Sequence, residues 1–185
     1  MTTVPRPRDV PSSTFADVLR QSYEQFATST AIVGVEGPVT YSELGKRALR
    51  VAASLRKRGL VQGDRVVLLT ANRPEFFEVE HAALMGGFVR VALSPRLHPK
   101  EVAHIIRDAG ASALFVEPEW ESKLPEVLSN CPEIAVAVGF GDSPAAPAQH
   151  LSYRELLAES PDAEPVPYVV APDDLAALIY TSGTT

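Results

Sequence analysis

Short apolar runs suited to strands alternate with longer segments of helical periodicity, and this alternation is the feature that most limits the fold. The runs RVVLL, FVRVAL, SALFV and IAVAV begin roughly every 21 to 24 residues from Arg65 onward. That interval accommodates one strand, one helix and two short loops. Because a crossover helix joins parallel strands, the chain is predicted to have an α/β fold, with a largely parallel sheet and flanking helices.

Turn residues indicate where the helices between these strands begin and end. Helical segments are predicted over residues 74–85, 99–109 and about 123–128. Gly86 and Gly87 follow the first and Gly110 follows the second, as expected for left-handed C-terminal caps. We interpret Asn72 with Glu75 as an N-terminal cap and its capping-box partner, and not as a polar site.

Two helices and a hairpin are predicted before the alternation begins. Apolar residues at helical spacing predict a helix over residues 14–27, and TAIVGVEGPVTY is typical of a β-hairpin. A second helix is predicted to begin at Thr40, which forms a capping-box sequence with Glu43. The basic residues over 46–58 are interpreted as a solvated face with cations near the helix C-terminus, and attraction of phosphate is the alternative.

The pattern after the last regular strand is less uniform. GFGDSPAAPAQH and ESPDAEPVPYVVAPDD are interpreted as loops, with a helix over 153–158 between them. LAALIY, residues 175–180, follows two aspartates and is rich in leucine and alanine, so propensity favours a helix. Its shortness, its β-prone end and the turn residues behind it favour a buried strand, which is the interpretation adopted.

Composition limits the partners and the compartment of the chain. The 185 residues carry a formal net charge of -6, which argues against a nucleic-acid surface. Cys131 is the single cysteine and no Cys/His cluster has ligand spacing, so neither a disulfide nor a metal site is predicted, and a cytoplasmic location is expected. Residues 1–13 are expected to form an extended, proline-rich arm, and no apolar run predicts a signal peptide or a membrane span.

The last five residues, TSGTT, combine hydroxyl groups with a glycine. Gly183 permits backbone angles closed to other residues, and the four hydroxyls stand beside their own amide N–H groups. Such a turn can surround phosphate oxygens, although it lacks the Walker A spacing. Taken alone, TSGTT is more typical of a flexible polar linker than of a phosphate-binding turn.

Four blocks in the chain resemble the adenylate-forming (AMP-binding) superfamily in family order. They are VTYSEL, LRKRGLVQGDRVVLLTANRPEFF, ALMGGFVRVALSPRLHPKEVAHIIRDAGASALF and YTSGTT, the last of which matches the start of the family loop Y-T-S-G-T-T-G-x-P-K-G. The resemblance covers nearly all of residues 14–185 and is strongest to acyl-CoA and aryl-CoA synthetases. One departure is VAL at 91–93, where the family commonly has a proline.

This resemblance implies that residues 14–185 are the N-terminal part of the large domain of an AMP-forming carboxylate ligase. In that family a carboxylate attacks the α-phosphate of Mg-ATP to give an acyl-adenylate and pyrophosphate, and a thiol such as that of CoA then displaces AMP. The family loop embraces the β- and γ-phosphates. The resemblance therefore implies ATP binding by Thr181, Ser182, Gly183, Thr184 and Thr185.

The chain stops inside that loop, so we expect the 185-residue fragment to be catalytically silent, with no catalytic residue and no bound cofactor of its own. Exposed apolar surface is expected to drive it into a homo-oligomer. An acyl-AMP ligase or an amino-acid adenylation domain that delivers to a carrier-protein thiol remains open. A rival of another class is a non-catalytic αβ association module.

The histidines and the cysteine are given structural or surface roles. His81 and His104 fall on predicted helices without a partner serine or aspartate nearby in sequence. His98 is expected just before the helix that Pro99 begins, and His150 in a loop. Cys131 has no evident activating base and is interpreted as a bystander.

Overall fold

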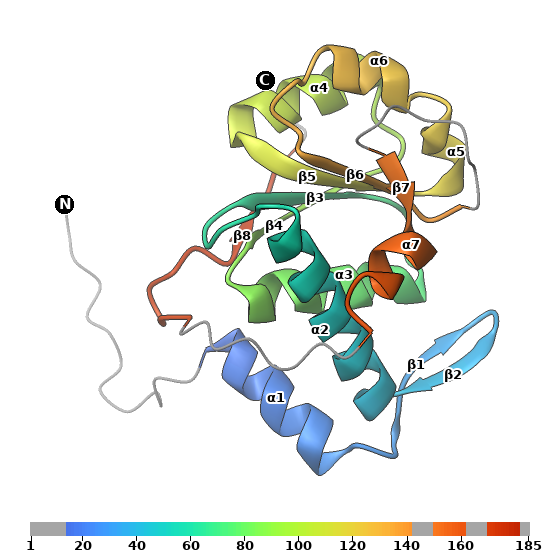
Figure 1. The fold of residues 1–185 in the computed structure, drawn as a ribbon, viewed down its shortest axis with the longest axis vertical. Coiled ribbons are helices and arrows are strands. Elements are labelled where there is room, and N and C mark those ends of the chain that lie inside the picture. Colours follow the sequence, from blue (N-terminus) through green and yellow to red (C-terminus); the bar gives the residue numbers. More distant parts are fainter. Residues whose placement is uncertain (1–13, 142–149, 162–169, 182–185) are drawn as a thin grey trace.

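A six-stranded parallel sheet forms the centre of the part of the chain that the structure, a computed structural model, describes: residues 14–141, 150–161 and 170–181. Its strands are β3 (Arg65–Leu69), β4 (Val89–Leu93), β5 (Ala111–Val116), β6 (Val136–Gly139), β7 (His150–Ser152) and β8 (Ala177–Leu178). They stand in the order β7-β6-β5-β3-β4-β8, and each neighbouring pair is parallel (Figure 1). The predicted α/β fold with a parallel sheet is confirmed.

Helices cover both faces of this sheet. The lower face in Figure 1 carries α2 (Tyr41–Lys57), α3 (Pro74–Gly86) and α7 (Tyr153–Ala158), and the upper face carries α4 (Pro99–Ala109), α5 (Pro118–Glu121) and α6 (Leu124–Ser129). Outside α2 lie α1 (Phe15–Gln25) and an antiparallel hairpin of β1 (Thr30–Gly34) and β2 (Gly37–Thr40). No helix in the described ranges has both the length and the apolar character needed to cross a bilayer.

The side chains of β3 show why the apolar runs of this sequence are continuous. Val67 and Leu69 pack into the cluster under α4 and α6, whereas Val66 and Leu68 pack into the cluster under α2 and α3. All four are fully buried. Because helices cover both faces of a parallel sheet, strand residues of either parity must be apolar.

The predicted caps account for the helix boundaries. Thr40 caps α2, and its hydroxyl accepts from the backbone N–H of Glu43, whose carboxylate accepts from the N–H of Thr40. Gly87 and Gly110 end α3 and α4 in the left-handed region, with φ of 70° and 61°. Local sequence therefore sets these boundaries.

The interpretation of Asn72 as a cap is wrong. Pro74 is the first residue of α3, so the cap position falls on Arg73, which makes no side-chain cap hydrogen bond. Glu75 then lies too early in the helix to close a capping box with Asn72, and its carboxylate instead accepts two 2.9 Å hydrogen bonds from the Arg73 guanidinium. Pro74 fixes the first residue of α3, because its restricted φ and missing N–H suit the first helical turn.

Two other expectations change around the later loops. His150 begins β7, which pairs in parallel with β6, so the predicted loop ends one residue earlier. The short helix α5 was not predicted; it places Trp120 in the core, 1% exposed. LAALIY is not a helix, but only Ala177 and Leu178 of it form a strand, and both are partly exposed, so the prediction of a buried strand over the whole run is wrong.

The basic face of α2 is not simply solvated. The Arg47 guanidinium donates a 2.9 Å hydrogen bond to Glu78 on α3, and Arg58 forms a two-point ion pair with Glu159 after α7. Arg56 donates to the carbonyl of Gly86 at 2.7 Å. These cations join α2 to its neighbours, which neither the solvated-face nor the phosphate interpretation included.

Candidate functional site

The carboxyl ends of β4 and β8 lie at the same edge of the sheet, because the two strands are parallel neighbours. Ser94 follows β4 directly, and Thr181 comes three residues after β8. Between them and α4 is a cavity of about 710 Å³, a size that suits small-molecule ligands. It is lined by Ala92, Leu93, Ser94, Leu97, Lys100, Glu101, His104, Ile105, Tyr180 and Thr181.

Both polar and apolar side chains line this cavity. Lys100 and His104 stand one turn apart on α4, Glu101 lines the cavity as well, and Leu93 and Leu97 contribute hydrocarbon. Thr181 is exposed, so its hydroxyl and backbone N–H can donate to a ligand oxygen. The site can therefore take a ligand with an anionic group at the strand ends and an apolar portion.

Tyr180 joins this edge of the sheet to the end of α4. Its ring packs against the upper core cluster, and its hydroxyl donates a 2.6 Å hydrogen bond to Oδ2 of Asp108. The bond to this carboxylate raises the pKa of Tyr180 to about 12, so the phenol stays protonated at neutral pH. The packing and the hydrogen bond thus anchor Tyr180, the residue that directly precedes Thr181.

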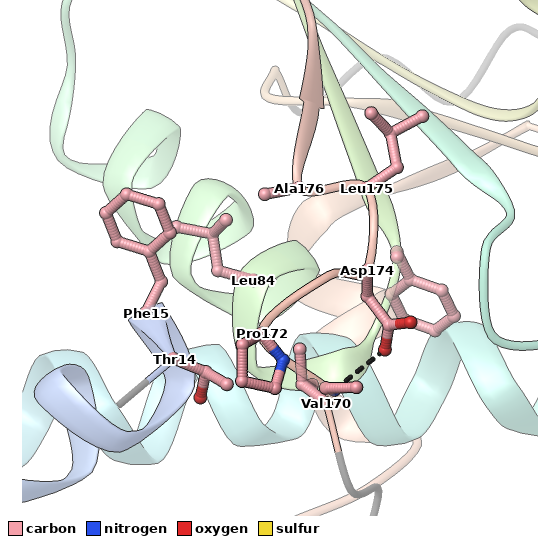
Figure 2. A pocket seen from close by; sticks show the side chains of 10 residues that line it. Thr14, Phe15, Leu84, Val170, Pro172, Asp174, Leu175 and Ala176 are labelled. Carbon is pink, nitrogen blue, oxygen red and sulfur yellow. Dashed lines mark hydrogen bonds between the residues drawn. The ribbon is translucent and has the colours of Figure 1, made fainter. Parts of the chain in front are cut away.

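A smaller cavity of about 170 Å³ lies between the start of α1, α3 and the segment before β8 (Figure 2). Asp174 points into the turn below it and accepts a 2.8 Å hydrogen bond from the backbone N–H of Ala171, drawn as a dashed line. The same carboxylate oxygen accepts from Gln62 Nε2 at 3.0 Å. This carboxylate is engaged in holding the turn that leads into β8, and the cavity is too small for a nucleotide.

The crevice between β3 and β5 is the other place where a ligand could be expected in such a sheet, because the connections after these strands run in opposite directions. There the Glu117 carboxylate accepts a 2.8 Å hydrogen bond from the N–H of Ala71, and the N–H of Glu117 donates to the carbonyl of Leu69 at 3.2 Å. A side chain of the protein therefore bridges this point, and the β4–β8 edge is the better candidate.

Two of the histidines differ in their surroundings. The Nδ1 atom of His81 on α3 lies 2.7 Å from the hydroxyl oxygen of Tyr23 on α1. Burial lowers the pKa of His81 to about 4. It is a neutral structural residue. His104 lines the large cavity beside Thr181, a position that its sequence context did not reveal.

Cys131 is buried and its Sγ lies 3.5 Å from the carbonyl of Ala103. Burial raises the pKa of this thiol, which disfavours the thiolate. Its interpretation as a bystander is consistent with these surroundings. Within the described ranges, no three His, Cys, Asp or Glu side chains lie close enough to hold a metal ion.

Of the residues predicted to bind ATP phosphates, Thr181 borders the large cavity, and Ser182, Gly183, Thr184 and Thr185 lie outside the described residues. Lys100 and the other α4 residues at the site were not predicted from the sequence. The sequence did contain a pattern that could have predicted them. Lys100 and His104 are four residues apart, so they share one face of a helix that begins shortly after the carboxyl end of a strand.

These features define a class of protein, the parallel α/β domains that bind ligands at the carboxyl ends of their strands. The sequence profile of the AMP-binding enzyme family matches residues 19–185. The chain belongs to this family.

Curated relatives of the chain are ligases. It is 35% identical over 164 residues to a fatty acid–[acyl-carrier-protein] ligase of Streptomyces coeruleorubidus. The aligned region covers 88% of this chain and 30% of that protein. It is 33% identical over 156 residues to a 3-hydroxybenzoate–CoA/4-hydroxybenzoate–CoA ligase of Thauera aromatica, covering 84% and 29%. The chain thus spans less than a third of the length of these relatives.

Solved structures agree with this assignment. The anthranilate CoA ligase AuaEII in complex with anthranoyl-AMP superposes with a TM-score of 0.83 at 25% identity, over 95% of this chain and 34% of that one. The apo structure of Mycobacterium smegmatis MbtA gives a TM-score of 0.80 at 27% identity, over 94% and 32%. The fold is that of the N-terminal part of adenylate-forming enzymes.

Proposed function

We propose that residues 14–185 are the N-terminal part of the large domain of an ATP-dependent, AMP-forming ligase that activates a carboxylic acid. The observation that carries the proposal is Thr181, which begins the family-like loop and borders the cavity at the carboxyl edge of β4 and β8. The names of the relatives support a fatty or aromatic acid as the substrate class. The extended arm predicted over residues 1–13 lies outside the described residues.

In this proposal the phosphate-binding residues are Thr181, Ser182, Gly183, Thr184 and Thr185. Thr181 offers a hydroxyl and a backbone N–H at the strand end, and Lys100 on α4 adds a cation to the same cavity. Mg-ATP supplies the electrophilic phosphorus, and the residues of this chain hold and orient the phosphate oxygens. No catalytic residue is assigned to the chain.

The acceptor of the acyl group is proposed to be CoA. A carrier-protein thiol is the second candidate, favoured by the fatty acid–[acyl-carrier-protein] ligase among the relatives. The free cysteine agrees with the cytoplasmic location that we also propose.

By itself the 185-residue chain is proposed to be inactive and to self-associate. The match to the two ligases above covers only 30% and 29% of their lengths, and β8 is an edge strand in the described sheet. Ile179 is 80% exposed and Leu175 is 57% exposed along that edge. Apolar surface beside an unpaired strand edge favours association with another chain.

The test compares this chain with the protein made from its whole open reading frame. We expect the whole protein to release pyrophosphate from ATP with a fatty or aromatic acid, and to form a thioester with CoA. The 185-residue chain should release none above a control without protein. A reading frame that ends at Thr185, or a whole protein without pyrophosphate release across fatty, aromatic and amino acids, would overturn the proposal and favour the association module.

A further inference from the structure

β8 holds the start of the loop only weakly. The strand has two residues, and its register with β4 consists of Arg90 opposite Ala177 and Val91 opposite Leu178. One further backbone hydrogen bond, from the N–H of Arg90 to the carbonyl of Ala176, lies before the strand. Because the ladder ends at Leu178, the sheet alone does not fix the backbone of the residues that follow.

Tyr180 provides a second attachment after the ladder ends. The aromatic ring packs on the upper core cluster, and the hydroxyl reaches across to α4, where it donates to Oδ2 of Asp108 at 2.6 Å. Thr181 follows Tyr180 immediately and lines the large cavity. The position of the Thr181 backbone therefore depends on where Tyr180 is held.

Asp108 occupies a position that helix electrostatics disfavour. It is the second-last residue of α4, which ends at Ala109 and the left-handed cap Gly110. A carboxylate in the last turn of a helix is repelled by the unpaired carbonyl groups there. Its hydrogen bond to Tyr180 is a compensating interaction, which is charge-assisted and lies at the exposed surface.

We propose that Asp108 and Tyr180 are a positioning pair that sets the Thr181 end of the ATP-phosphate loop. This inference rests on the proposed function, because it assigns these residues to the same site. Asp108 lies outside the cavity lining and Tyr180 is part of it, but the hydrogen bond between them acts on the loop through the backbone of Thr181. A loop end that is ordered before ATP binds loses less conformational freedom on binding, so the pair strengthens ATP binding without contributing to binding of the acid.

The first test uses steady-state kinetics of the whole ligase. Tyr180→Phe and Asp108→Ala should raise the KM for ATP by about tenfold, the change expected from loss of a charge-assisted hydrogen bond, and leave the KM for the acid unchanged. Asp108→Asn keeps an oxygen acceptor and should restore most of the ATP affinity. Tyr41→Phe, which removes a hydroxyl outside the site, is the matched control. Unchanged ATP parameters in both disrupting variants would overturn the proposal.

The second test uses the 185-residue chain and does not depend on catalysis. Backbone order parameters from NMR relaxation at positions 180 and 181 should fall in Tyr180→Phe and Asp108→Ala, with those in β3 and β5 unchanged. The midpoint of thermal unfolding should not fall in Asp108→Ala, because removal of the carboxylate also relieves the helix end. Unchanged order parameters at Thr181 would refute the positioning role. A fall in the unfolding midpoint with order lost throughout the chain would refute it too. If the whole protein lacks ligase activity, the proposed function fails while this measurement still decides whether the pair orders the loop end.

Discussion

The hydroxyl of Tyr153 donates a 2.6 Å hydrogen bond to Oε2 of Glu78, a carboxylate that is 1% exposed. The other oxygen of Glu78 accepts from Arg47 at 2.9 Å. One buried carboxylate thus joins α2, α3 and α7 beneath the sheet. Burial and the neighbouring Glu78 hold the pKa of Tyr153 well above its ordinary value, so this hydroxyl remains a donor.

We predict that Tyr153→Phe destabilises the chain by about 1–3 kcal/mol, because it leaves a buried carboxylate with one donor fewer. The free energy of unfolding from urea titration measures the effect. Tyr41→Phe is the control, and it should change stability by less than about 0.5 kcal/mol. Equal losses in the two variants would contradict a special role for the Tyr153 bond.

Stability should fall between neutral and mildly acidic pH because of His81. Its pKa is lowered from 6.5 to about 4 by burial, so the unfolded chain takes up a proton at a higher pH than the folded one. Neutral His81 contributes to the free energy of unfolding above about pH 6.5. This contribution, at most about 3 kcal/mol, is lost as the pH falls toward 4. His81→Gln keeps an acceptor for Tyr23 and should flatten the pH dependence of unfolding over that window. A variant with the wild-type pH dependence would show that His81 is not its source.

Gly45 is predicted to resist substitution even though it lies inside a helix. A Cβ at this position of α2 would sit 2.8 Å from Cδ2 of Tyr23 on α1. Alanine gains about 1 kcal/mol in helix propensity, but overpacking costs about 1–3 kcal/mol, so Gly45→Ala should be destabilising. In a Tyr23→Ala background the clash disappears, and the same change should become stabilising. Denaturant titration of the four proteins measures both signs.

The thiol of Cys131 should not react in the folded chain. It is 1% exposed and burial raises its pKa, so a disulfide reagent such as Ellman's reagent should label it only when urea unfolds the chain. Labelling should then follow the unfolding curve. Rapid labelling of the native chain at pH 8 would contradict the buried position.

Local sequence was enough for most boundaries in this fold. Thr40 with Glu43 and the glycine at 110 act through their own backbone neighbours, so the helices that they bound could be predicted. Asn72 shows the limit of that reasoning, because Pro74 set the helix frame one residue later than the apparent capping pair. β7 could not be predicted because a three-residue strand is specified by its partner β6 and not by its own composition.

The candidate site was predicted only in part. The resemblance of the terminal loop pointed to Thr181 and the four residues after it, and the cavity at Thr181 supports that proposal. Lys100 and His104 were not connected with it, because about eighty residues of chain separate them from Thr181. Parallel pairing of β4 with β8 brings these segments to one edge.

The sequence by itself determined the α/β class, the alternation of strands with helices and the resemblance to adenylate-forming enzymes, because these depend on patterns within short segments. Tertiary structure alone decided which distant side chains meet. Asp108 and Tyr180 are separated by 72 positions, and their hydrogen bond exists only because the sheet places β8 next to β4 and α4 crosses above them. Strand order is set by packing of whole elements, and no local pattern in the sequence records it.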